Sequence, residues 1–522
     1  MRRVLNELRI WLIRAVCLAI FSTGSESALG DYRAAQTYFN QRDFASAASA
    51  FFQAYGYPKS NEEKAKSEWG LAQSLQNLQL FYSASKFYSI IVRRGPKANN
   101  PFFRMALEEL GKINATIPLG QSQIVELFKA KIDPAAVPGP ARGFYFYYLG
   151  LEEFSKKRYE KADSYLRNVP AGSPYYIRAI FHLGVVSNLS GAHGRAISYF
   201  EKVKAAAPGT DEGEYLREVA NLNIARVFYE TKKFQEALRY YAQIPRDSDN
   251  WLEAHFEAAW TFFMLQEHNN ALGNIHTIHS PFFENRFFPE SYILQAVTFL
   301  RLCRYSQVKI SLKEFKERYK PIFKELGDML KRSRGDSREF FKNVYDYRAG
   351  TLSKYRDAWS ILDALSRMDA YKEAGNTVRF VDQELAYLSR YQGRWNAAGL
   401  LDELHGFLSK KKSAAIADAG VRLYESGTGL YYYLKALSDQ THFINAEMLM
   451  GKVDALRAKL KVPTAEKRVQ FIGGMKPLPK GEEIEFWPFE GEYWEDELGY
   501  YVFNIESKCG SVASGGSGGG KK

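Results

Sequence analysis

Small, apolar and polar positions alternate along residues 182–209, "HLGVVSNLSGAHGRAISYFEKVKAAAPG", in a pattern that predicts two antiparallel helices. Gly184 falls in the first helix, Ala196 and Phe200 fall in the second, and "SGAHG" forms the turn between them. Because proline cannot donate the helical hydrogen bond, Pro208 ends the second helix. The two small residues, twelve positions apart, let the helices approach closely, and Phe200 fills the space one turn further on.

The same pattern recurs in successive units along the first part of the chain. The paired small or apolar positions are Ala35 and Ala47, Ala72 and Ala84, Gly150 and Ala162, Gly184 and Ala196, Ala225 and Ala237, Ala259 and Ala271, and Ala296 and Val308. Residues 100–138 keep the period only weakly, since Ala106 fits but Pro118 occupies the second small position. We expect that unit to be distorted.

A period of about 34 residues with small residues at the eighth and twentieth positions and an aromatic at the twenty-fourth resembles the tetratricopeptide repeat family. The resemblance extends over roughly residues 31–325, about eight units. It implies an all-α fold in which helix–turn–helix repeats stack into a right-handed superhelix with a concave groove.

By the register of that family, the second, fifth, ninth and twelfth positions of each first helix line the groove. The candidate groove residues are Tyr147, Phe154, Arg178, Asn188, Arg226, Tyr229, Trp260 and Phe263. Aromatic and basic groups interleave among them, which suits an extended peptide with hydrophobic anchors and acidic or C-terminal carboxylate groups. The alternative is that the aromatic residues only pack against neighbouring helices.

The rest of the chain differs from the solenoid predicted for residues 29–326. Residues 327–462 lack proline and carry apolar stripes, which indicates a bundle or hairpin of long helices. Residues 463–509 alternate carboxylates with aromatic residues, which favours short strands or an extended segment. Residues 510–522, rich in Gly and Ser, form a flexible tail.

Residues 1–28 have the layout of a secretory signal peptide, with a basic start, an apolar middle and a small-residue exit. An uncleaved membrane-anchoring or interfacial helix is the alternative, because Arg14 splits the apolar stretch. Two cysteines, Cys303 and Cys509, follow this segment. We expect Cys303 within a helix and both thiols free, with a disulfide as the alternative.

Charge is unevenly distributed. The net charge is +12 for the chain, +16 for residues 29–481 and −6 for residues 482–522. An acidic, aromatic end beside a basic solenoid suggests an intramolecular clasp over the groove, and a small cap for the helical region is the alternative. Nucleic acid is not an expected partner, because the basic residues are scattered among acids and no known nucleic-acid-binding module is present.

Few residues are arranged for catalysis or metal binding. His268, His276 and His279 cluster without further ligands to complete a metal site. Glu425 and Glu506 each precede a serine, as in some glycan-cleaving enzymes, but neither has the surrounding domain that a walled acid pocket needs. We expect no enzymatic activity, no cofactor and no metal.

The sequence therefore predicts an exported, periplasmic scaffold of a Gram-negative-type envelope. Its partners would be proteins bound through the groove, as peptide segments or as subunits of an envelope assembly such as outer-membrane assembly, secretion, pilus or gliding machinery. An accessory protein of cell-wall remodelling that binds peptidoglycan or its enzymes is the alternative.

Overall fold

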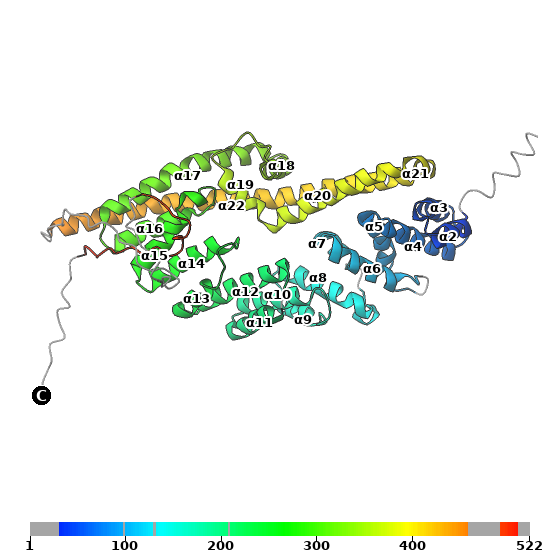
Figure 1. The fold of residues 1–522 in the computed structure, drawn as a ribbon, viewed down its shortest axis with the longest axis horizontal. Helices are drawn as coiled ribbons and strands as arrows, with labels where there is room; N and C mark the ends of the chain where they lie inside the picture. Colours follow the sequence, from blue (N-terminus) through cyan, green and yellow to red (C-terminus); the bar gives the residue numbers. More distant parts are fainter. Residues whose placement is uncertain (1–30, 98–99, 129–131, 207–208, 458–490, 510–522) are drawn as a thin grey trace, which may run out of the picture. The chain divides into compact units, whose positions relative to one another are not determined.

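A computed structural model describes residues 31–97, 100–128, 132–206, 209–457 and 491–509. These residues are predominantly helical and contain no β-strand, which confirms the predicted all-α fold (Figure 1). The chain forms two compact units. The first unit combines the repeats up to Tyr176 with Lys372–Asp418, and the second combines Ile177–Tyr371 with the residues from Ala419 onward.

The first unit contains four consecutive helix pairs. They are α2 (Tyr32–Asn40) with α3 (Phe44–Gly56), α4 (Asn61–Asn77) with α5 (Phe81–Arg93), α6 (Phe103–Thr116) with α7 (Gln121–Phe128), and α8 (Arg142–Ser155) with α9 (Tyr159–Arg167). Three further helices complete it, namely most of α20 (Asp369–Leu388), α21 (Gln392–Ala398) and the first part of α22 (Leu400–Arg457).

The second unit also contains four helix pairs. They are α10 (Tyr176–Leu189) with α11 (His193–Ala206), α12 (Asp211–Glu230) with α13 (Phe234–Tyr241), α14 (Trp251–Met264) with α15 (His268–Ile278), and α16 (Pro289–Arg301) with α17 (Tyr305–Ser333). The helices α18 (Ser337–Arg348) and α19 (Trp359–Ser366) and the remainder of α22 complete this unit.

The small residues of the repeat lie where paired helices touch. Ala196 is fully buried, and a Cβ added at Gly184 would lie only 2.6 Å from the ring of Phe200. The same closeness is found at Gly150, whose added Cβ would lie 2.6 Å from Leu166. The predicted role of these positions is therefore confirmed, because a larger side chain would separate the helices.

A left-handed turn residue marks the register of seven helix pairs. It always lies two residues before the second helix and has φ between 52° and 75°. The residues are Arg42, Gln79, Lys157, Gly191, Lys232, Gln266 and Cys303. The pair α6–α7 departs from this geometry, since its left-handed residue, Gly120, directly precedes α7. This is the unit that the sequence predicted to be distorted.

The last repeat helix is longer than the sequence indicated. The boundary expected at residues 326 and 327 falls inside α17, which continues through Pro321 to Ser333. Ile322, Leu326 and Met329 keep the apolar side of the helix buried beyond the proline. Their packing offsets the backbone hydrogen bond that proline cannot donate.

The C-terminal helices contribute to both units instead of forming one bundle after the repeats. Within the first unit, Trp395 of α21 is fully buried and its indole Nε1 donates to the carbonyl of Ala45 at 2.9 Å. Within the second unit, Phe340 of α18 packs so closely on α22 that a Cβ at Gly427 would lie 2.5 Å from its ring. The sequence pattern identified the helices but not these long-range contacts.

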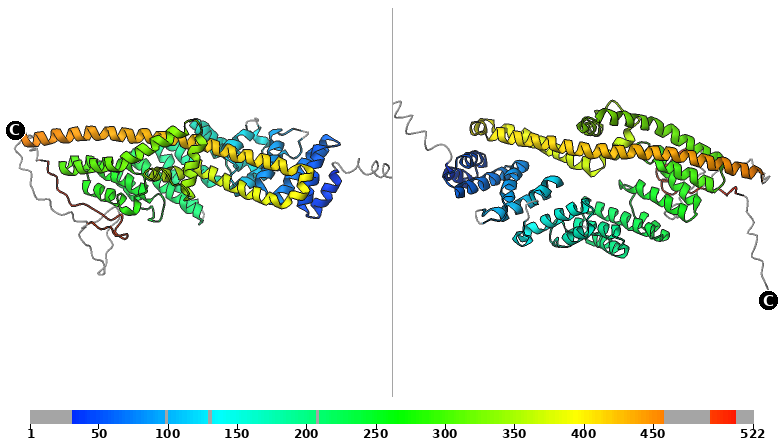
Figure 2. Two further views of the ribbon diagram at one scale, coloured as in Figure 1. Left: turned by 90° about the horizontal axis from the view of Figure 1, so that it is seen from above. Right: turned by 180° about the vertical axis from the view of Figure 1, so that it is seen from behind.

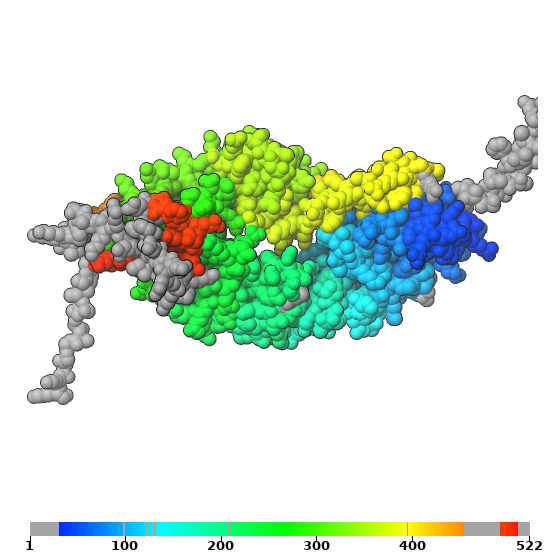
Figure 3. Space-filling view, viewed as in Figure 1, coloured from blue at the N-terminus to red at the C-terminus, as the bar shows by residue number. Residues whose placement is uncertain are grey.

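Residues 491–509 form an irregular segment of the second unit, with turns at residues 495–500 and without the strands that were considered (Figure 3). Leu498 and Tyr501 are buried in the hydrophobic core that includes Trp251. The backbone passes so close to α15 that a Cβ at Gly273 would lie 1.7 Å from the carbonyl oxygen of Tyr501. The remainder of the predicted segment, residues 463–490, lies outside the described residues, as do residues 1–28 and 510–522.

The two cysteines form a disulfide, so the expectation of free thiols was wrong. Cys303 was also misplaced, because α16 ends at Arg301 and Cys303 lies in the following turn. Its partner reaches it because the chain before Cys509 runs along α15, and the amide of Lys508 donates to the carbonyl of Leu302 at 2.8 Å. The bond joins residues 206 positions apart.

Candidate functional site

The predicted groove residues occupy both units, and their exposure differs. In the first unit, Tyr147 is only 5% exposed and stacks on Tyr175, with ring centroids 5.4 Å apart. Phe154, also in this unit, is half-buried. Tyr147 therefore belongs to the core of its repeat, which is the alternative that the sequence left open for aromatic residues.

In the second unit, three predicted aromatic residues lie on consecutive first helices. Tyr229 is on α12, and Trp260 and Phe263 are on α14, where their rings meet edge to face at 5.8 Å. All three are half-buried, so each ring presents part of its surface to solvent. They pack partly against the core residues of the same repeats.

The aromatic residues at the twelfth position also support the turn of their own repeat. Phe154 contacts Tyr159 at 6.0 Å between ring centroids, and Tyr229 contacts Phe234 at 5.5 Å. In both pairs the second residue is the first residue of the next helix. Loss of either ring would therefore affect packing as well as the exposed surface.

The predicted arginines are engaged by glutamates. Arg226 forms a two-pronged ion pair with Glu257, at 2.5 and 2.8 Å, and reaches Glu253 at 3.1 Å. Arg178 pairs with Glu212 at 2.6 Å. Both contacts join first helices of successive repeats, so these guanidinium groups link the repeats.

Asn188 also links neighbouring repeats, since its amide donates to Glu230 at 3.1 Å. The glutamates that pair with Arg178, Arg226 and Asn188 were not predicted from the sequence. A signal was present for Glu253, which occupies the second position of its repeat and so belongs to the same register as the predicted groove residues. The carboxylates make this face of the second unit less basic than the arginines alone suggested.

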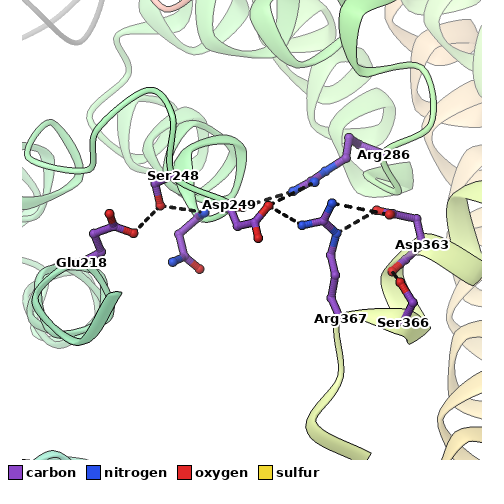
Figure 4. A network of polar contacts seen from close by, with 8 residues as sticks. Glu218, Ser248, Asp249, Arg286, Asp363, Ser366 and Arg367 are labelled. Atoms are coloured by element: carbon purple, nitrogen blue, oxygen red, sulfur yellow. Dashed lines mark hydrogen bonds and ion pairs between the residues drawn. The ribbon is translucent and has the colours of Figure 1, made fainter. Parts of the chain in front are cut away.

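A polar network joins the loops of the second unit to α19 (Figure 4). Asp249, in the loop before α14, accepts from Arg367 at 2.5 Å and lies 4.0 Å from Arg286. Arg367 also donates to Asp363 of α19 at 2.9 Å. These salt bridges hold α19 against the repeat loops of the second unit.

The histidines of the predicted cluster are half-buried, and two of them pack on aromatic rings. Burial lowers the pKa of His276 to about 4 and that of His279 to about 3. His276 stacks on Tyr493 with ring centroids 4.6 Å apart, and His279 stacks on Tyr292. Among the described residues, no group of three or more side chains is placed to hold a metal ion.

No helix in the described part of the chain is long and apolar enough to cross a membrane.

No protein-family model matches the sequence, and no curated protein matches it significantly. Several solved structures of similar arrangement share 10–13% identity with this chain. The apo form of RapI aligns with a TM-score of 0.35 over 68% of this chain and 96% of that one, at 12% identity. A Rap protein complexed with Competence and Sporulation Factor aligns with a TM-score of 0.28 over 70% of this chain and 99% of that one, at 11% identity. The apo quorum sensor NprR from B. thuringiensis aligns with a TM-score of 0.25 over 76% of this chain and 95% of that one, at 11% identity.

Scores this low carry no functional argument. The assignment of a tetratricopeptide-type fold therefore depends on the helix pairs, buried small residues and turn geometry of this chain.

Proposed function

We propose that this protein is a non-enzymatic scaffold that binds segments of partner proteins on the first-helix face of its second unit. The supporting observation is the group of half-buried aromatic side chains, Tyr229, Trp260 and Phe263, on α12 and α14. Rings that are anchored by the core but open on one side provide apolar contact area at low entropic cost. Because Arg226 is already paired, apolar anchors of the partner would contribute more to binding than its acidic groups.

Site-specific photocrosslinking tests this proposal in cells. A photoreactive residue at Trp260 should capture a defined partner, whereas the same residue at Arg239 should not. Arg239 is a suitable control because it lies on the second helix α13 of a neighbouring repeat and is exposed. Equal capture from both positions, or capture that a Tyr229→Ala substitution leaves unchanged, would place the binding surface elsewhere.

We also propose that the chain acts in an oxidising compartment after export. The Cys303–Cys509 disulfide supports this, because such bonds persist outside the reducing cytosol. The predicted signal peptide, residues 1–28, is consistent with it. Fusion of these residues to alkaline phosphatase, which needs disulfides to be active, should give activity in a bacterial host; an inactive, cytosolic fusion would contradict export.

We propose that this compartment is the periplasm and that the protein acts there as part of an envelope assembly. The alternative is binding to peptidoglycan or its enzymes, and sedimentation of the purified chain with isolated sacculi separates the two. Retention on sacculi that Trp260→Ala does not reduce would favour the cell-wall alternative over a protein-binding face.

A further inference from the structure

A second, separate groove lies in the second unit, between α17 and the C-terminal half of α22. The two helices run antiparallel, as shown by close approach of Gly327 to Tyr431 and of Gly451 to Tyr305 (Figures 1 and 2). The cavity between them has a volume of about 960 Å³. None of the eight predicted groove residues lines it.

The floor of this groove is aromatic. Phe315 and Tyr319 are 4% and 3% exposed and form its base on α17. Phe323 stacks on Tyr431 across the two helices, with ring centroids 4.2 Å apart. Tyr432 lies at the rim and is 60% exposed. An apolar group entering the groove would therefore meet rings on both walls.

The rim of the groove is basic. Lys316 and Lys320 on α17 and Lys435 on α22 are exposed and have no ion pair or hydrogen bond within the described residues. Lys313, also at the rim, is 3.6 Å from Glu317, and Asp439 is the acidic side chain of the lining. Elsewhere in this unit basic groups are commonly paired, as Arg226 and Arg367 are. Lys316, Lys320 and Lys435 therefore carry positive charge without a direct carboxylate partner among the described residues.

We propose that this groove binds an acidic segment of a partner protein that also carries aromatic or other large apolar side chains. The rings on both walls would receive the apolar side chains, and the lysines at the rim would face the carboxylates. The recess lies between two helices, so it fits a narrow segment better than a flat membrane surface. This surface is independent of the aromatic face on α12 and α14.

Fluorescence anisotropy with a labelled octapeptide that alternates glutamate with phenylalanine or tryptophan tests the proposal on the full chain. The double substitution K316E/K435E should weaken binding about tenfold or more, because it reverses one charge on each wall. The matched control K202E/K331E changes the net charge equally on exposed lysines outside the lining, and it should leave affinity within about twofold.

The apolar contribution is tested separately. Tyr432→Ala should weaken binding severalfold, whereas Tyr215→Ala, at a 50% exposed tyrosine on α12, should not. A peptide with alanine in place of the aromatic residues, or with lysine in place of glutamate, should bind much more weakly. Trp260→Ala should leave binding of the octapeptide unchanged, because Trp260 lies outside this groove. Failure of the proposed function on α12 and α14 would therefore not affect this test.

Several outcomes would overturn the proposal. If K316E/K435E and K202E/K331E lower the peptide affinity equally, the effect comes from the overall charge and not from a binding site in the groove. Binding of anionic vesicles in preference to the peptide would indicate a membrane surface. Self-association abolished by K316E/K435E would identify a second copy as the occupant. By contrast, stronger peptide binding after the four glutamates of residues 482–490 are changed to glutamine would support the groove as the binding site and show that this segment competes for it.

Discussion

Reduction of the Cys303–Cys509 bond should release residues 491–509 from the second unit. The bond closes a loop of 206 residues, for which the chain-entropy relation gives a contribution to folding of about 5 kcal/mol. The contacts that remain are modest. Burial of Leu498 and Tyr501 contributes about 1.5–3 kcal/mol each at most. Because ordering the backbone of this segment opposes its attachment, the segment should detach at least part of the time once the cross-link is removed.

Hydrogen exchange read by mass spectrometry measures this locally, and local measurement is needed because a chain of two units does not unfold in one step. In the oxidised protein, the amides of Gly499, Phe503 and Lys508 should be protected, since they donate to Thr277 Oγ1 and to the carbonyls of Asn269 and Leu302. After reduction and alkylation, or in C303S/C509S, these amides should exchange much faster.

Peptides from α4 and α5 in the first unit provide the internal control and should be unaffected. Unchanged protection of residues 491–509, with both thiols shown to be alkylated, would refute the reasoning. It would mean that noncovalent contacts alone hold the segment to α15.

Three further predictions concern single positions. Gly184→Leu should lower the exchange-derived stability of α10 and α11 by about 1–3 kcal/mol through overpacking against Phe200; amide exchange equal to that of the parent would contradict the close approach. Glu384 accepts from two amides at the start of α5 and lies near the buried Lys411, whose pKa burial lowers to about 8. Glu384→Ala should therefore cost about 3–5 kcal/mol, and Glu384→Gln less, in exchange-derived stability of α5. His276 has a pKa of about 4 when buried and a higher one when unfolded, so the unfolded state binds the proton first and stability falls as the pH drops from about 6.5 towards 4. His276→Phe should make that decline shallower, and an identical pH profile in the variant would contradict the buried, neutral histidine.

The repeat register could be predicted because it is a local property of the chain. Gly184, Ala196 and Phe200 lie within one helix pair, and their sizes alone require the two helices to sit close together. Even the distortion near Pro118 was visible, since proline stands there at the position where the repeat needs a small residue.

The pairing and exposure of the predicted groove residues could be predicted less well from the sequence. The register placed Arg226 on a first helix. Its ion pairs with Glu253 and Glu257, which lie one repeat later, could not be predicted from that position. Tyr147 has the position of a groove residue and the burial of a core residue, because Tyr175 covers it. Periodicity gives the direction of a side chain on its own helix, whereas exposure depends on what the neighbouring helix brings against it.

By itself, then, the sequence determined the helix pairs, their turns and the small residues between them, because these follow from contacts a few positions to one repeat apart. Only the tertiary structure decided that Cys303 bonds to Cys509, that Glu384 caps α5, and that lysines of α17 and α22 share one groove. Those features join residues more than a hundred positions apart. No periodic pattern encodes such pairs, since each depends on where the returning helices and the C-terminal segment come to rest within their own unit.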